Sequence, residues 1–448
     1  MTATSPRPDA AAPPSARFEF TRRTLDPSSG RVRLFYRLWL DGRRHDLEER
    51  FEFGPGPGAG DARDEALAAA LDLLHWTAGV SYWKTACRGV VAFGERAPDD
   101  WQAAALETLY RDGLAELAWR NDLGRRYWPA FAAGVRAAPR AGAAGLPGDA
   151  VLVPMGGGKD SLVALERVRR RGLEPETVQV GSAELIGRVA ARAGTRHLRV
   201  ERRLAPELAA LNAAGALNGH VPVTAINAAA LIVLALLRGR GAVVFANERS
   251  ADHPTLIGDD GVAVNHQFAK SFTFEALLAE WIRRYVATDL AVFSILRRDR
   301  ELAVCREFAS LTNYHDVFSS CNRNFHLDGA RTARWCGDCP KCRFVFLGLA
   351  PFLAPARMRA IFGTDLLADP GQRPGFEALL ALDGALPFEC VGEPDEARAA
   401  LRLLGAAPAW REHAVVRTLQ HRLRGAAVPD AAALMQPAGP HLIPDRFA

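Results

Sequence analysis

A glycine-rich turn between an apolar run and an amphipathic segment limits the fold of this chain more than any other feature. Residues 151–154 (Val-Leu-Val-Pro) have the composition of a buried β-strand, and residues 161–171 carry apolar side chains at helical spacing. The six residues that join these segments are Gly156, Gly157, Gly158, Lys159, Asp160 and Ser161. A strand that turns directly into a helix is the unit of a parallel sheet with crossover helices, so the turn predicts an α/β domain.

The same turn has the chemistry of a phosphate-binding loop. Glycines let the backbone approach an anion closely, and the free amides at the start of a helix attract negative charge. Ser161 can donate a hydrogen bond, Lys159 can supply a positive charge, and Asp160 can orient the loop or bind magnesium. A Walker loop would need Ser or Thr directly after the lysine, and a dinucleotide loop would need a third glycine at Ser161, so neither pattern fits. The alternative is a glycine-rich turn that binds nothing.

The sequence predicts four regions along the chain. Residues 1–16, rich in Pro, Ala and Ser, are expected to form a disordered tail. Residues 17–140 are expected to form an N-terminal α+β domain, because apolar and polar residues alternate around the turn dipeptide Asp41-Gly42 and helical patterns follow. Residues 148–310 are predicted to form a doubly wound parallel sheet that binds a nucleotide, with further strands at 177–180, 197–200 and 243–246. Residues 311–448 are expected to form a helical region that carries a cysteine cluster.

Length, charge and cysteine count exclude several classes of protein. A chain of 448 residues is too long for one ordinary core, and a net charge of +5 is too small to indicate nucleic-acid binding. The longest apolar stretch, residues 223–237, contains Asn227 and falls short of the ~20 apolar residues of a membrane-spanning helix, so it predicts a buried helix. Seven cysteines, four of them within residues 321–342, do not fit a secreted disulfide framework. We therefore expect a cytoplasmic protein.

Four closely spaced cysteines predict a structural zinc site: Cys321, Cys336, Cys339 and Cys342. The last three have the short spacing that lets a chain fold around one ion, and Cys321 lies upstream as the fourth ligand. Thiolates are soft ligands that suit tetrahedral zinc, and four of them leave no open position for chemistry. His315 or His326 could replace Cys321. The alternative is a group of reduced, buried thiols without metal.

Polar side chains gather after the strand at 243–246 and again a little further along the chain. In an open parallel sheet, ligands bind beyond the carboxyl ends of the strands. These side chains are therefore candidates for binding carboxylate, amide or sugar groups, and a solvated loop is the alternative. Arg249 is the strongest candidate for a carboxylate partner, because its planar guanidinium can donate two parallel hydrogen bonds. The predicted substrate-binding residues are Asn247, Arg249, Ser250, Asn265 and Gln267.

The loop resembles the Ser-Gly-Gly-x-Asp-Ser loop of the PP-loop ATP pyrophosphatases, which include asparagine synthetase, NAD synthetase and tRNA-modifying adenylating enzymes. Gly156 stands where that pattern has its first Ser. The resemblance implies a fold of the PP-loop type, binding of ATP with Mg²⁺, and cleavage of ATP to AMP and diphosphate through an adenylated intermediate. The cysteine cluster is similar to the Cys-Gly-x-Cys-x-x-Cys knuckle of 7-cyano-7-deazaguanine synthase, which implies structural Zn²⁺.

Taken together, the motifs resemble those of the UDP-N-acetylmuramoyl-L-alanyl-L-glutamate epimerase family, and the resemblance covers most of the chain. It implies an ATP-dependent epimerase of peptidoglycan precursor synthesis. Such an enzyme inverts the terminal L-Glu of UDP-N-acetylmuramoyl-L-Ala-L-Glu to D-Glu through an acyl-adenylate. The motifs are residues 79–84 (Gly-Val-Ser-Tyr-Trp-Lys), 156–161, 247–250 (Asn-Glu-Arg-Ser), 265–267 (Asn-His-Gln), 270–271 (Lys-Ser) and 336–342.

Inversion of a carbon centre needs a base and an acid on opposite faces of that carbon. Outside the cysteine cluster, the chain has Cys87, Cys305 and Cys390, and a racemase with two catalytic cysteines is not the obvious interpretation. The acid and base candidates, which the sequence does not rank, are His266, Lys270, Glu248 and His253.

Two other hypotheses stay open. Another adenylating enzyme, similar to 7-cyano-7-deazaguanine synthase or to the tRNA-thiolating enzymes, would share the loop and the cysteines. A tRNA enzyme would be expected to carry a concentrated basic surface, whereas the arginines here are scattered. A non-enzymatic zinc protein that binds nucleic acid or a partner would leave the phosphate loop unexplained. The sequence predicts no particular oligomeric state.

Overall fold

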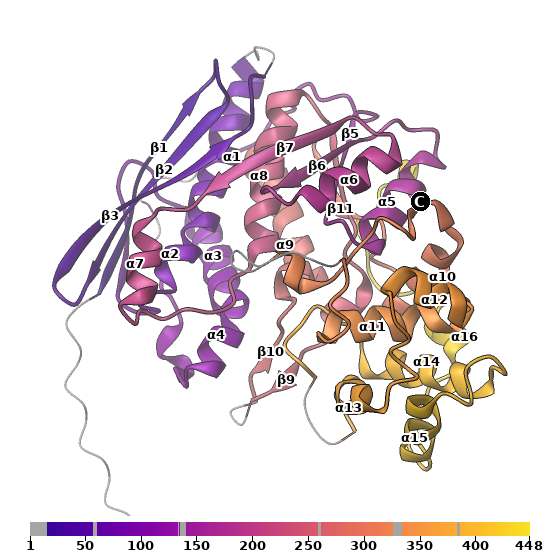
Figure 1. Ribbon diagram of the computed structural model, residues 1–448. Helices are drawn as coiled ribbons and strands as arrows, with labels where there is room; N and C mark the ends of the chain where they lie inside the picture. Colours follow the sequence, from indigo (N-terminus) through magenta and orange to yellow (C-terminus); the bar gives the residue numbers. More distant parts are fainter. Residues whose placement is uncertain are drawn as a thin grey trace, which may run out of the picture.

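A nine-stranded mixed sheet runs through the molecule (Figure 1) in the order β11-β8-β5-β6-β7-β3-β2-β1-β4. The structure is a computed structural model that describes residues 16–56, 61–132, 134, 140–258, 261–325, 334–382 and 386–448. A separate ribbon pairs β9 (Leu256–Ile257) with β10 (Ala263–Val264). The strands of the large sheet are β1 (Arg17–Asp26), β2 (Arg31–Leu40), β3 (Arg43–Glu52), β4 (Val90–Phe93), β5 (Val151–Pro154), β6 (Glu176–Val180), β7 (His197–Arg203), β8 (Ala242–Phe245) and β11 (Ala291–Ser294).

Five neighbouring strands, β11, β8, β5, β6 and β7, form the parallel half of the sheet. The strand predicted at 151–154 is β5, and the three further predicted strands correspond to β6, β7 and β8 at nearly the same residues. Successive side chains of a strand face opposite sides of a sheet. Leu152 accordingly packs in one hydrophobic core, while Val151 and Val153 pack in the other. The predicted α/β fold with a parallel sheet is confirmed.

The N-terminal strands extend this same sheet. β3 pairs antiparallel with β7, with Arg50 opposite Arg203. β2 and β3 form the predicted hairpin around Asp41-Gly42, and β1 pairs with both β2 and β4. The apolar face of β1 and β2 lies in one core with the helices α1 (Asp61–Ala78) and α8 (Val223–Arg238). The region predicted as an N-terminal domain therefore shares a sheet and a core with the predicted nucleotide-binding region.

Helices cover both faces of the parallel half (Figure 1). On one face α1 packs against α8, the helix predicted at 223–237, and α9 (Phe272–Trp281) belongs to the same core. On the other face α5 (Lys159–Arg169) packs against β5 and α10 (Glu301–Ser310). Among the described residues, no helix has both the length and the hydropathy needed to span a membrane. The other helices before the cysteine cluster are α2 (Val80–Trp83), α3 (Asp100–Gly113), α4 (Ala115–Arg120), α6 (Glu184–Ala193) and α7 (Glu207–Ala213).

The C-terminal region is helical, as predicted, and packs in the same core as α5 and α10. The chain end, η9 (Asp445–Phe447), returns to the parallel half of the sheet. There the ring centroid of Phe447 lies 4.9 Å from that of Phe293 in β11. The helices of this region are α11 (Pro340–Leu349), α12 (Pro355–Phe362), α13 (Arg373–Leu380), α14 (Pro394–Ala406), α15 (Ala414–Arg422) and α16 (Ala431–Leu434).

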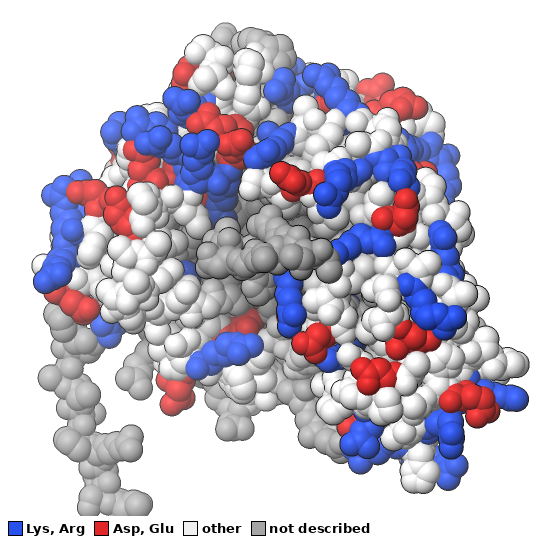
Figure 2. All heavy atoms as spheres, viewed as in Figure 1, with Lys and Arg blue, Asp and Glu red and all other residues white. Residues whose placement is uncertain are grey.

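Charged side chains of both signs are interspersed over the face of the molecule in Figure 2. Oppositely charged side chains also pair between β2 and β3, where Arg33 lies 2.6 Å from Glu48 and Arg37 lies 3.0 Å from Asp46. Because these pairs are partly exposed, each adds little to the free energy of unfolding.

Candidate active site

The predicted phosphate loop joins β5 to α5, and its three glycines differ in how much room they leave for a side chain. Gly158 is the N-cap of α5, and a Cβ there would lie 2.6 Å from Ser320 Oγ. Gly157 has a φ of +79°, a left-handed conformation that costs other residues about 1–2 kcal/mol. By contrast, a Cβ at Gly156 would meet nothing within 4 Å. The loop therefore has room for a side chain at position 156, where the PP-loop pattern has Ser.

The backbone of this loop presents a surface that fits a phosphate group. Among the described residues, no acceptor bonds the amides of Gly156, Gly157 and Gly158. They stand at the N-terminus of an 11-residue helix, where the helix dipole favours an anion. Ser161 Oγ donates to the Gly158 carbonyl at 3.1 Å, and the Ser319 amide donates to the Gly157 carbonyl at 3.0 Å. These bonds hold the turn while its own amides stay free for a ligand.

Lys159 is completely buried, and its ammonium is held by two carboxylates. The Nζ atom donates to Asp160 and to Glu301 at the start of α10. Burial alone would lower the pKa of Lys159, but the charges of Asp160 and Glu301 outweigh it and raise that pKa well above its ordinary value. Burial and the charge of Asp160 raise the pKa of Glu301 to about 7. The predicted positive charge of the loop thus faces a carboxylate inside the protein.

The segment after β8 lies beside the loop, at the carboxyl edge of the parallel strands. Glu248 is 4% exposed, and its burial together with the charge of Asp160 raises its pKa. Lys270 ends η3 (Phe268–Lys270). Burial would lower the pKa of Lys270, but the charges of Cys390 and Glu248 outweigh it and raise that pKa above its ordinary value. Two of the four acid and base candidates, Glu248 and Lys270, therefore lie close to the loop aspartate.

His266, the third candidate, belongs to a group of side chains from distant parts of the chain. Its Nδ1 lies 2.5 Å from Oε2 of Glu116 in α4, and its ring centroid lies 4.3 Å from that of His220. A hydrogen bond also joins His266 to Cys390. Burial would lower the pKa of His266, but its bonds to Cys390 and Glu116 raise that pKa to about 9. The ring is therefore an imidazolium at neutral pH.

The side chains of three predicted substrate-binding residues donate hydrogen bonds within the protein. Ser250 Oγ donates to Glu396 at 2.6 Å. Asn265 Nδ2 donates to a backbone carbonyl at 2.9 Å, and Gln267 Nε2 donates to the carbonyl of Val391 at 3.0 Å. The buried Oε1 of Gln267 has no partner within the described part of the chain. Gln267 therefore keeps a free acceptor for a ligand.

The remaining candidates differ in their surroundings. The buried Nε of Arg249 lacks a hydrogen-bond partner among the residues that the structure describes, and burial together with the charge of Arg300 lowers the pKa of Arg249. Asn247 and Ser271 line a small cavity of about 20 Å³. His253 is exposed, and no contact between described residues links its ring to the groups around Lys270. The structure thus brings His266, Lys270 and Glu248 into one neighbourhood and leaves His253 at the surface.

The four predicted metal ligands lie together: Cys321, Cys336, Cys339 and Cys342. Their Sγ atoms all lie within 4.8 Å of one another. The Sγ of Cys342 is 3.4 Å from that of Cys339 and 3.7 Å from that of Cys336. Four thiolates at such distances fit a tetrahedral zinc ion, which they would hold in a closed structural site.

Cys321, and not His315, completes this set. The Nε2 of His315 contacts the carbonyl of Phe308 at 3.2 Å, and its Nδ1 accepts from Arg357 at 3.0 Å, so both ring nitrogens are engaged away from the thiols. His326, the other alternative, lies outside the described residues, as do the first 15 residues of the predicted tail. Ser319 and Ser320, which contact the phosphate loop, directly precede Cys321 in the chain.

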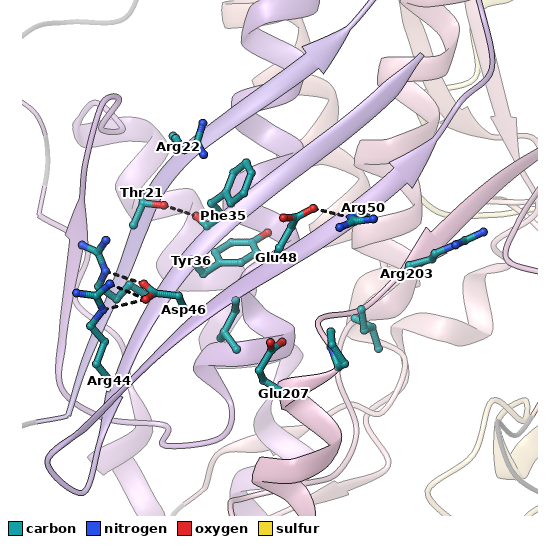
Figure 3. Close-up of a pocket in the computed structure, with 14 residues that line it drawn as sticks. Thr21, Arg22, Phe35, Tyr36, Arg44, Asp46, Glu48, Arg50, Arg203 and Glu207 are labelled. Carbon is teal, nitrogen blue, oxygen red and sulfur yellow. Dashed lines mark hydrogen bonds and ion pairs between the residues drawn. The ribbon is translucent and has the colours of Figure 1, made fainter. Parts of the chain in front are cut away.

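A wide hollow of about 700 Å³ lies elsewhere, on the open face of the N-terminal strands (Figure 3). It is lined by residues of β1, β2, β3 and β7 and by the start of α7. In it Arg44 pairs with Asp46, and Arg50 pairs with Glu48. No residue predicted to bind nucleotide, substrate or metal lines this hollow. We therefore place the candidate active site at the loop and the strand ends.

Comparisons with known proteins identify the family. A family model described as the MurL N-terminal domain matches residues 10–295, and one described as the MurL C-terminal domain matches residues 317–434. The chain belongs to the MurL family. One MurL relative, from Xanthomonas oryzae pv. oryzae (strain MAFF 311018), is 43% identical over 435 residues, which cover 95% of each chain. Another, from Salinispora tropica (strain ATCC BAA-916 / DSM 44818 / JCM 13857 / NBRC 105044 / CNB-440), is 43% identical over 437 residues, or 96% of this chain and 94% of the relative.

Both relatives carry the name UDP-N-acetyl-alpha-D-muramoyl-L-alanyl-L-glutamate epimerase. The family resemblance inferred from the motifs is therefore confirmed. Three residues of this MurL site escaped the sequence analysis: Glu116, Glu301 and Cys390. The two glutamates lie in helices without any motif, so nothing local marks them. Cys390 did carry a signal, because it is one of few cysteines outside the metal cluster.

Proposed function

We propose that this protein is an ATP-dependent epimerase that inverts the terminal L-Glu of UDP-N-acetylmuramoyl-L-Ala-L-Glu to D-Glu and releases AMP and diphosphate. One observation carries the proposal: a loop with free amides at a helix start adjoins buried acid and base groups, including Glu248 and Lys270. The substrate is inferred from the name that the MurL relatives carry over nearly the whole length of the chain.

Activation by ATP would explain how a proton can leave the carbon beside a carboxylate. Removing that proton from the free acid builds a second negative charge next to the first. In the proposed reaction, the α-carboxylate of the terminal Glu attacks the α-phosphorus of ATP, and diphosphate leaves as the P–O bond breaks. The acyl-adenylate no longer carries the carboxylate charge and can delocalise the new one. Each ~1.4 kcal/mol removed from the barrier is worth tenfold in rate.

Proton transfer and hydrolysis complete the proposed reaction. A base removes the Cα proton, and an acid returns a proton to the opposite face. Water then attacks the acyl carbon. This step regenerates the carboxylate of the terminal D-Glu and releases AMP. His266, Lys270 and Glu248 are the acid and base candidates that lie near the loop, and His253 is the exposed one. The residues proposed to bind the substrate are Asn247, Arg249, Ser250, Asn265 and Gln267, with Arg249 opposite a carboxylate.

Asp160 is proposed to bind the Mg²⁺ that accompanies ATP. Burial would raise the pKa of Asp160, but the positive charges of Lys159 and Lys341 outweigh it and lower that pKa, so the side chain is a carboxylate at neutral pH. The amides of residues 156–158 are proposed to hold the diphosphate in a loop of the PP-loop type. Zn²⁺ on the four cysteines would stabilise the fold, and no step of the reaction uses it. Because ATP and UDP-sugars are cytoplasmic metabolites, we propose that the protein acts there.

The test is incubation of the protein with ATP, Mg²⁺ and UDP-N-acetylmuramoyl-L-Ala-L-Glu, followed by measurement of AMP, of diphosphate and, after acid hydrolysis of the product, of the chirality of its terminal glutamate. We expect all three products to form together, and Asp160→Ala to abolish them. A matched control is Asp112→Ala, which removes an aspartate of α3 that pairs with its neighbour Arg111. AMP that forms only with a carboxylated deazaguanine or with tRNA would instead favour one of the other adenylating activities.

A further inference from the structure

Cys390 lies among charged side chains that come from several parts of the chain. It is hydrogen-bonded to His266 and lies next to Lys270. On the far side of His266, Glu116 contacts the imidazole Nδ1 at 2.5 Å. The ammonium of Lys341 donates to the backbone carbonyl of Cys390. The result is a chain of contacts from carboxylate to imidazole to thiol, beside an ammonium group.

These neighbours determine the protonation of the thiol. Burial would raise the pKa of Cys390, but the charges of Lys270, His266 and Lys341 outweigh it and lower that pKa to about 5. The adjacent Glu389 is an acidic group that interacts with it. With the pKa of His266 at about 9, the two form a thiolate and imidazolium pair at neutral pH. Thiolates held next to such cations are the reactive form of cysteine in enzymes.

Cys390 differs in this respect from the other two cysteines outside the metal cluster. Burial raises the pKa of Cys87 to about 12, and burial likewise raises the pKa of Cys305 above its ordinary value. Cys390 also lies near the phosphate loop, because Lys270 interacts with both Cys390 and the loop residue Asp160. Gln267, whose Nε2 bonds the residue after Cys390, leaves a buried acceptor free at the same place.

We propose that Cys390 is one of the two groups that exchange the Cα proton of the terminal Glu, and that His266 and Glu116 position its thiolate. This inference rests on the proposed epimerase function. The thiolate takes the Cα proton, an S–H bond forms, and the electron pair of the C–H bond moves into the activated carbonyl. A second acid of the cluster, an ammonium or a carboxylic acid, gives its proton to the opposite face. The thiol then returns its proton to solvent, and the second acid takes one up, so that protons balance.

The first test separates proton exchange from adenylation. In D₂O, the wild-type protein is expected to incorporate deuterium at Cα and to release diphosphate. Cys390→Ser should keep diphosphate release, while deuterium incorporation and epimerisation fall by about 10²–10⁴-fold, the usual contribution of one acid or base. The control is Cys87→Ser, which should retain both activities. A Cys390→Ser protein that epimerises within a few-fold of wild type overturns the inference, whereas a wild type that releases no diphosphate with this substrate overturns the proposed function instead.

The second test measures the ionisation of the Cys390 thiol directly and does not depend on catalytic activity. The rate at which iodoacetamide alkylates Cys390, followed by peptide mass spectrometry, should be half-maximal near pH 5. In His266→Gln this midpoint should move up toward the ordinary thiol value of 9.0, because the neighbouring positive charge is gone. His421→Gln, at an exposed position of α15, is the control and should leave the midpoint unchanged. A midpoint near 9 in the wild type contradicts the assignment.

Discussion

Several buried charges at the candidate site face a charge of opposite sign. Asp160 and Glu301 raise the pKa of Lys159, and Cys390 and Glu116 raise that of His266. Breaking a buried pair by removing one partner typically costs 3–5 kcal/mol, because the remaining charge is left uncompensated. Neutral substitutions of similar shape are therefore the informative ones here, since they change the charge and preserve the packing.

Glu116→Gln tests the role of the carboxylate behind His266. Because the negative charge of Glu116 helps to raise the pKa of His266 to about 9, the amide should lower that pKa. His266 is protonated below its pKa, so the substitution makes it lose its proton at lower pH. The alkaline limb of the pH profile of kcat/KM should therefore move from near pH 9 to lower pH. Glu201→Gln, which removes a partly exposed acid of β7, should leave the profile unchanged. An unaltered limb in Glu116→Gln would show that the carboxylate does not act through His266.

The residues of the site differ in how far the sequence could predict them. The loop glycines, Asp160 and the clustered cysteines were predictable, because their spacing along the chain is itself the chemical signal. Glu116 and His266 are 150 positions apart in sequence. Their contact depends on how α4 packs against the segment after β10, which a single sequence does not encode locally.

Among the helices and strands, those whose own residues and adjoining turn show a clear pattern were predicted well. α5 and the hairpin of β2 and β3 combine a periodic apolar pattern with a turn residue at the right place, and β5 is a short apolar run that leads into the glycine-rich turn. β1, β4 and β11 were missed. β4 and β11 have four residues each, like β5, but no glycine-rich turn follows them, and hydrogen bonds to their neighbours β1 and β8 define them. β1 has ten residues, but its polar half from Thr21 onward weakens the alternation.

The strand-turn-helix element makes a prediction about its own glycines. Gly157→Ala should destabilise the loop by about 1–2 kcal/mol, because Ala strongly disfavours its φ of +79°. The KM for ATP should rise as the amides lose their alignment. Gly156→Ser is the matched change, since a Cβ there meets nothing within 4 Å. It should alter the free energy of unfolding by less than about 0.5 kcal/mol and leave the KM for ATP equal or lower. Measurements of KM in the diphosphate-release assay and of urea unfolding check both. A Gly157→Ala protein with unchanged KM would contradict the proposed role of this turn.

At the scale of the whole molecule, the regions that the sequence predicts as separate are joined by a shared sheet and by contacts. The pairing of β3 with β7 makes one sheet of the N-terminal and nucleotide-binding regions. The cysteine cluster joins the C-terminal helices to the phosphate loop, because Cys321 follows Ser319 and Ser320, which contact Gly157 and Gly158. Such long-range contacts leave no mark in local sequence patterns, which is why the joined architecture could not be predicted.

This connection gives the zinc site a consequence for ATP binding. If four thiolates hold a structural zinc ion, removing the ion with a chelator or by Cys339→Ser should lower Tm by about 1 °C for each kcal/mol of stability lost in a chain of 448 residues. Because the segment at 319–321 would loosen, the KM for ATP should rise, while the pH profile of kcat should stay as it is. Calorimetry measures Tm, and metal analysis checks that the ion has been removed. The diphosphate-release assay measures the KM for ATP and the pH profile of kcat. Cys87→Ser should change none of them. A metal-free protein with an unchanged Tm would refute the structural zinc site, and a shifted pH profile would place the metal in the chemistry.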